Sequence, residues 1–80
     1  HVNRHLRGIV MTRNVLPPEG AEVWLDDRMC GTLTSVGESL GVMAPIALCL
    51  LRREVEPGTE VEVRWPGSST PAIARELPLL

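Results

Sequence analysis

The sequence contains no lysine, tyrosine or phenylalanine, and Trp24 and Trp65 are its only aromatic residues. Its 8 basic residues are all arginines, scattered along the chain against 10 acidic ones. Binding to nucleic acid or to an anionic membrane needs concentrated basic charge, and single-strand binders add aromatic stacking platforms. No apolar run approaches the ~18 residues of a membrane-spanning helix. We therefore expect no nucleic acid and no membrane as partners, and a cytoplasmic location.

Cysteine and histidine are also scarce, with two of each. Cys30 and Cys49 lack the paired spacing of a zinc site, so we expect buried reduced thiols and no metal, with a disulfide as the alternative. Ser35, Ser39 and His5 have no nucleophile-elbow motif and no spaced acidic partner. The sequence therefore predicts no catalytic residues.

Turn signals divide the chain into short segments with strand patterns. Residues 60–65 alternate polar and apolar side chains, which predicts a half-buried strand with Val61, Val63 and Trp65 facing inward. Pro-Gly dipeptides on both sides are typical of chain reversals. We expect the partner strand over residues 71–77.

The N-terminal half predicts three more strands, over residues 6–11, 22–25 and 28–34. Asp26-Asp27 separates the last two as a two-residue hairpin turn, because aspartate tolerates left-handed backbone conformations. Gly31, inside the third strand, indicates a bulge or a close backbone approach. Each of these elements is short enough for a small β-domain.

Two segments are less decided by local pattern. Residues 44–53 suit a helix, with a proline in the first turn, or a strand buried on both faces, because the apolar run is unbroken. Residues 34–41 are small and polar, and we expect them to form a long connection between strands that could contact a ligand. Apolar residues at the surface are expected at Leu40, Val42 and Met43, and at the C-terminal Leu79-Leu80.

Seven short motifs occur in the order and at the spacing of one family: Arg4 with Arg7-Gly8, Pro17 to Gly20, Gly31 to Ser35, Ser39, Ile46 to Leu48, Pro57 to Thr59, and Leu77-Pro78. Together they resemble the C-terminal barrel domain of the glycine-cleavage T-protein (aminomethyltransferase) superfamily. Within it, the start of the chain and residues 51–54 are more similar to the folate-binding YgfZ-type branch. The resemblance covers essentially the whole chain.

The resemblance implies a strand over residues 44–53. Six strands separated by regular turns then predict an all-β fold, a small six-stranded antiparallel barrel of Greek-key type, closed so that no edge is exposed. Residues 1–80 are expected to form a single C-terminal domain of a larger folate-dependent protein.

The implied function is that of an accessory barrel, not catalytic alone, which walls the folate channel and supports the catalytic domain. Its partners are upstream domains of the same polypeptide and tetrahydrofolate, bound mainly by those domains; the parent protein is an aminomethyltransferase or an iron–sulfur maintenance factor. Arg7, Thr34, Ser35 and Ser39 are the candidate folate contacts, through a guanidinium fork and hydroxyl groups. The alternative is a stand-alone protein-interaction barrel with no small-molecule ligand.

Overall fold

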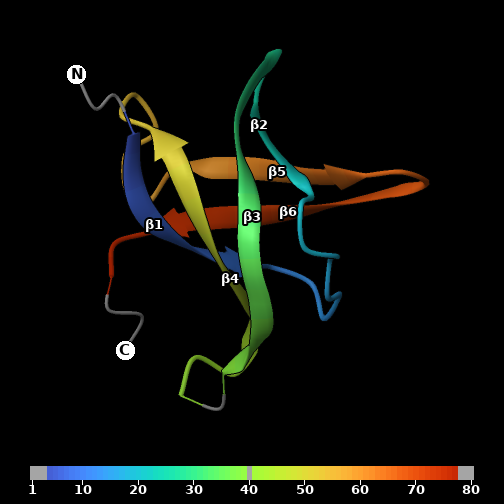
Figure 1. Cartoon of the computed structure of the whole chain (residues 1–80). Helices are drawn as coiled ribbons and strands as arrows, with labels where there is room; N and C mark the ends of the chain where they lie inside the picture. Colours follow the sequence, from blue (N-terminus) through green and yellow to red (C-terminus); the bar gives the residue numbers. More distant parts are fainter. Residues whose placement is uncertain (1–3, 40, 78–80) are drawn as a thin grey trace.

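Six antiparallel strands close on themselves in the computed structural model, which describes residues 4–39 and 41–77 (Figure 1). The strands are β1 (Arg4–Met11), β2 (Glu22–Leu25), β3 (Arg28–Ser39), β4 (Ala44–Arg52), β5 (Glu60–Trp65) and β6 (Ser68–Arg75). Around the barrel they follow the order β1-β4-β3-β2-β5-β6, and no helix occurs among the described residues. Because β2, β3 and β4 follow one another as hairpins and β1 lies beside β4, the topology is of Greek-key type. The predicted fold class is confirmed.

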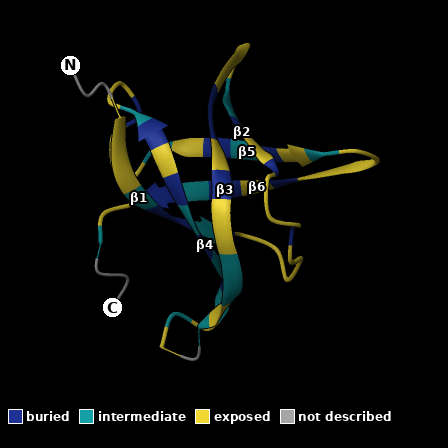
Figure 2. Ribbon diagram, viewed as in Figure 1, coloured by how far each residue is buried: buried dark blue, intermediate teal, exposed yellow. Residues whose placement is uncertain are grey.

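The hydrophobic core lies inside the barrel and is formed by inward-facing side chains of all six strands. Figure 2 shows where the buried residues lie along the strands. The largest fully buried apolar side chains are Ile9, Met11, Val23, Leu51, Val55 and Val63. Val61 is also buried and Trp65 packs against the cluster, which confirms the inward-facing residues predicted for β5.

The predicted reversals are confirmed by backbone conformation. Gly58 and Gly67 have φ values of 93° and 86°, in the region that glycine adopts at no steric cost. Asp26 takes φ 54° at the tip of the β2–β3 hairpin, where Leu25 pairs with Arg28. A two-residue turn therefore joins β2 to β3, as expected from Asp26-Asp27.

Gly31 satisfies both of its predicted roles. The β2–β3 register passes from Val23↔Gly31 to Trp24↔Met29, which leaves Cys30 as an extra, bulged residue. A Cβ atom at Gly31 would lie 2.4 Å from the backbone oxygen of Leu50. Only glycine permits β3 and β4 to approach this closely here.

Two predicted boundaries were wrong. Residues 34–39 belong to β3, because they pair with β4 from Ser35↔Leu48 to Ser39↔Ala44 instead of forming a long loop. The reversal is short, with the Met43 N–H donating to the Ser39 carbonyl at 2.7 Å. The partner of β5 begins at Ser68 and ends at Arg75, because Trp65 pairs directly with Ser68 across a two-residue turn.

β4 is a strand, as the resemblance implied, but it is not buried on both faces. Its residues alternate, with Ala47, Cys49 and Leu51 in the core. The residues between them point outward, and Leu50 is 48% exposed. A single-walled barrel has only one interior, so an unbroken apolar strand must leave one face outside. The outer face of β4 is therefore a candidate for the functional site.

Candidate functional site

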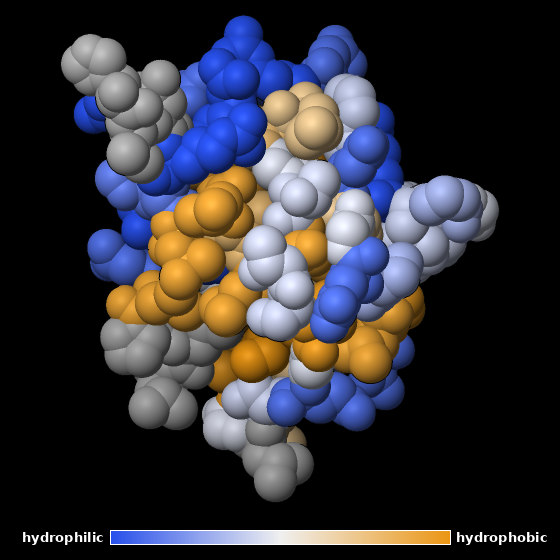
Figure 3. Space-filling model, in the orientation of Figure 1, coloured by the Kyte–Doolittle hydropathy of each residue, from blue (hydrophilic) through white to orange (hydrophobic). Residues whose placement is uncertain are grey.

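Apolar side chains gather on the outer side of β1, β4 and β6. We call this surface the β1–β4 face; it consists of Leu6, Val10, Ile46, Leu48, Leu50 and Ile73. The register places Leu6 opposite Leu50 and Val10 between Ile46 and Ile73. Leu6 and Leu50 are nearly half exposed and the other four are half-buried. Figure 3 shows the hydrophobic surface over this part of the molecule.

Arginines border the β1–β4 face. Arg4 and Arg52 are register partners at one end of it, and the exposed Arg75 lies opposite Gly8 in its middle. Neither β1 nor β4 contains an acidic residue. The β1 and β4 part of the face therefore combines apolar surface with positive charge, while the exposed Glu60 of β5 lies opposite Ile73 at its other border.

The opposite wall of the barrel, on β2 and β5, has a different chemistry. Its outer residues form cross-strand pairs of complementary groups, Glu22 with Arg64 and Trp24 with Glu62. The Arg64 guanidinium lies 4.4 Å from the centre of the Trp24 ring and forms an ion pair with Glu62. The Trp24 Nε1–H donates to Glu22 at 3.0 Å. The outer side of this wall is polar and charged, which suits contact with water.

The three predicted hydroxyl residues lie on β3, along the border of the β1–β4 face. Thr34 is the extra residue where the β3–β4 register shifts, and its Oγ1 donates to the Leu48 carbonyl at 3.2 Å. Ser35 is exposed and pairs with Leu48. Ser39 lies at the far end of the strand, where its Oγ accepts the Val42 N–H at 3.1 Å. Thr34 and Ser35 are thus together, and Ser39 is apart from them.

Arg7 is on the other side of the wall. It pairs with Cys49 in β4 and shares the inward register of Ile9, so it is separated from the three hydroxyls by the sheet itself. Its Nε is buried and has no hydrogen-bond partner among the described residues. The four predicted residues therefore do not form one site.

Of the apolar residues expected at the surface, the structure describes Val42 and Met43. Met43 is 87% exposed and takes φ 60°, while Val42 is half-buried. Leu40, Leu79 and Leu80 lie outside the described residues. Sequence reasoning placed exposed apolar residues at this tip and at the C-terminus, and missed the apolar surface on β1 and β4. The unbroken apolar run in residues 46–51 is the feature of the sequence that indicates this surface.

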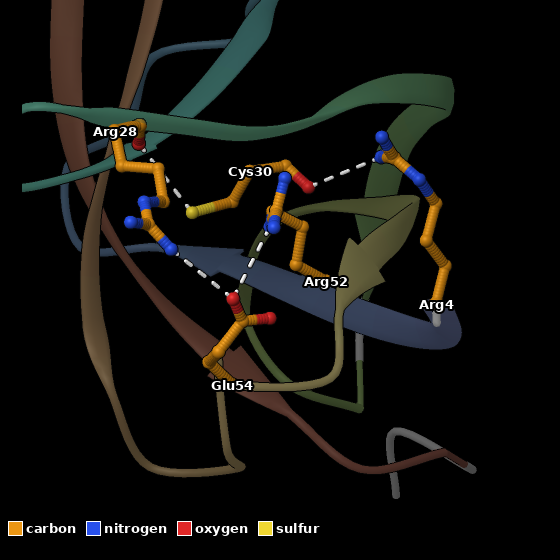
Figure 4. A network of polar contacts seen from close by, with 5 residues as sticks. All are labelled: Arg4, Arg28, Cys30, Arg52 and Glu54. Carbon is orange, nitrogen blue, oxygen red and sulfur yellow. Dashed lines mark hydrogen bonds and ion pairs between the residues drawn. The ribbon is translucent and has the colours of Figure 1, made fainter. Parts of the chain in front are cut away.

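A polar network joins residues of β1, β3 and β4 to Glu54 (Figure 4). Glu54 accepts from Arg28 at 3.2 Å and from Arg52 at 3.3 Å, and Arg4 donates to the Cys30 carbonyl at 3.3 Å. A hydrogen bond to backbone at Glu54, and then the Arg52 and Arg28 charges, lower the pKa of its carboxyl. These contacts tie the hairpin to the end of β4 and leave an open hollow of about 450 Å³ beside them.

The two cysteines are separate, buried thiols within the core. Burial raises the pKa of the Cys49 thiol to about 12, partly offset by the nearby Arg4 charge. A thiol that stays protonated is unreactive at neutral pH. Among residues 4–39 and 41–77, no group of histidine, cysteine and carboxylate side chains is arranged to hold a metal ion. The same residues include no helix long and apolar enough to cross a membrane.

Comparison with known proteins assigns the fold to a family. The family model of the glycine cleavage T-protein C-terminal barrel domain matches residues 4–80. The chain belongs to this family. No curated protein matches the chain. Among solved structures, the glycine cleavage system aminomethyltransferase T from Bartonella henselae is similar, with a TM-score of 0.82 at 21% identity. The match covers 98% of this T-protein barrel and 22% of that chain.

Proposed function

We propose that this T-protein barrel is an accessory domain of a tetrahydrofolate-dependent protein, in which it walls the folate channel and supports the catalytic domain without catalysing the reaction itself. The observation that carries the proposal is the family match over residues 4–80, in a chain that spans only about a fifth of a similar aminomethyltransferase. The upstream domains of the same polypeptide and the folate are its partners, and the protein is cytoplasmic.

The finer assignment follows from a small number of residues. The start of the chain and residues 51–54, Leu-Arg-Arg-Glu, resemble the YgfZ-type branch, and we propose that the parent protein belongs there, with true aminomethyl transfer as the alternative. Thr34, Ser35 and Ser39 are proposed folate contacts along the β3 border. Arg7, which faces the inside of the barrel, is proposed as a carboxylate partner separate from these hydroxyls.

The experiment compares the protein encoded by the complete gene with a version that ends before this domain. We expect the complete protein to bind tetrahydrofolate with a Kd near the micromolar range, about −8 kcal/mol, and the 80-residue chain alone to show no binding by calorimetry. Loss of binding on removal of the barrel supports the accessory role. Unchanged binding and activity without the barrel contradict it.

A stand-alone interaction barrel is the second candidate, and the exposed β1–β4 face favours it. An apolar surface of this kind serves docking on any protein partner. If the gene encodes no upstream domain and the protein binds no folate, this candidate replaces the first.

A further inference from the structure

The two walls of the barrel differ in a way that folding alone does not require. The β2–β5 wall pairs Glu22 with Arg64 across the strands, whereas the β1–β4 face pairs Leu6 with Leu50. Leu6 and Leu50 are 46% and 48% exposed. An exposed cross-strand leucine pair adds little to barrel stability, because half of its surface stays in water. The face therefore has the composition of a surface that another protein covers.

The border of the face specifies the charge of that partner. Arg4 and Arg52 lie directly opposite one another, and two like charges in this arrangement repel unless an anion lies near them. Glu54 forms an ion pair with Arg52, whereas the hydrogen bond that Arg4 donates within the described residues goes to the uncharged Cys30 carbonyl. Arg75 is exposed beside Gly8. A complementary partner presents apolar side chains to the centre of the face and carboxylates to Arg4 and Arg75, away from Glu60 beside Ile73.

The position of the face indicates where this partner comes from. β1, which carries Leu6 and Val10, is the first strand of the domain, and Leu6 follows the start of that strand by two residues. The similar aminomethyltransferase has 78% of its length outside the match, taking the complement of the 22% covered. A polypeptide that enters the barrel at β1 is held beside this face at a high effective concentration, so even a modest contact is favoured.

From these observations we infer that the β1–β4 face is the docking surface for the polypeptide preceding this domain, which covers Leu6 and Leu50 with apolar side chains and meets Arg4 and Arg75 with carboxylates. This inference rests on the proposed accessory role and names the surface through which it acts. It places the contact on β1 and β4, and not on the exposed Met43 tip.

The test uses the 80-residue chain and the polypeptide that its gene encodes ahead of it, produced separately and mixed in a calorimeter. We expect binding, and we expect the double variant Leu6→Ser/Leu50→Ser to weaken it by roughly 30-fold or more, because central apolar contacts dominate interface energy. Val15→Ser/Leu16→Ser is the matched control, since these two residues are similarly exposed in the β1–β2 connection. Its affinity is expected to stay within about twofold of the wild type.

Arg75→Glu tests the charge separately from the apolar contacts and from folding, because the side chain is exposed. We expect roughly tenfold weaker binding at low salt and a smaller dependence on salt. Thermal unfolding of each variant shows whether the barrel is intact; if the leucine variant unfolds, Arg75→Glu decides the test.

Two outcomes overturn the inference. One is the absence of binding between the two pieces, or binding that Leu6→Ser/Leu50→Ser and Arg75→Glu leave unchanged. The other is sedimentation showing that the barrel alone dimerises through Leu6 and Leu50 while it ignores the preceding polypeptide, which assigns the face to a second copy. Folate binding is measured apart, so a protein that docks through this face but binds no folate refutes only the proposed function.

Discussion

At Gly31 the β3 backbone lies against the β4 backbone with no room for a side chain. A methyl group there would meet the Leu50 carbonyl oxygen at 2.4 Å, and the obstacle is backbone that must shift as a whole. We expect Gly31→Ala to lower the free energy of unfolding by about 1–3 kcal/mol, the usual range for overpacking.

Gly37→Ala, in the same strand, is the control for this substitution. No atom outside its chain neighbours lies within 4 Å of a Cβ at Gly37. Its stability is expected to stay within about 1 kcal/mol of the wild type, because the substitution also reduces the freedom of the unfolded chain. Chemical denaturation measures both variants, and equal effects of the two would refute the close approach.

The Cys49 thiol makes the stability of the folded protein depend on pH in the alkaline range. The thiol has a pKa of about 12 in the folded protein and 9.0 when exposed. The unfolded chain therefore releases this proton first, so the contribution to stability is complete below pH 9 and is lost as pH rises towards 12. The expected slope is up to about 1.4 kcal/mol per pH unit. Urea titrations from pH 8 to 11 should show it, and Cys49→Ala should flatten the curve; an equal decline in that variant would contradict the assignment.

At the scale of the element, the stability of the β2–β3 hairpin depends more on Asp26 than on Asp27. Asp26 takes φ 54°, whereas Asp27 is not among the residues with positive φ. A β-branched side chain is strained in that conformation. We expect Asp26→Val to destabilise the protein by about 1–2 kcal/mol and Asp27→Val by much less. Melting temperatures compare the two, and a similar loss in both variants would show that turn geometry is not responsible.

The elements also show what local pattern can and cannot predict. Alternation in β5 identified its inward side chains correctly, because a period of two reports burial on one face directly. β4 gives no such signal, since its outer residues are as apolar as its inner ones. Local pattern therefore left helix and strand open and suggested burial on both faces. The closed topology decides the matter, and pairing across distant strands is not visible in a window of ten residues.

The same limit applies to the candidate site. Arg7 and Ser35 carry groups suited to a carboxylate ligand, but the barrel wall separates them because one faces inward and the other is exposed outside. The side on which a residue lies depends on register and bulges, such as the shift at Thr34. Residue types and spacing predicted the family, and coordinates were needed to show which side chains share a surface.

At the scale of the whole molecule, chemistry is distributed unequally around the barrel. One wall, on β2 and β5, carries polar and charged side chains, among them an ion pair between Glu62 and Arg64. The other, on β1 and β4, carries leucines, isoleucine and valine bordered by arginines. The polar wall is suited to water, and the apolar wall is the one that we infer another part of the protein covers.

The most direct measurement of this account is hydroxyl-radical footprinting of Leu6 and Leu50, in the protein encoded by the complete gene and in the isolated 80-residue chain. Leu16, 54% exposed in the β1–β2 connection, is the internal reference. We predict that Leu6 and Leu50 become at least about fivefold less reactive in the complete protein, because docking removes apolar side chains from water, while Leu16 does not change. Equal reactivity of Leu6 and Leu50 in the two proteins would contradict the claim that the β1–β4 face is where this barrel acts.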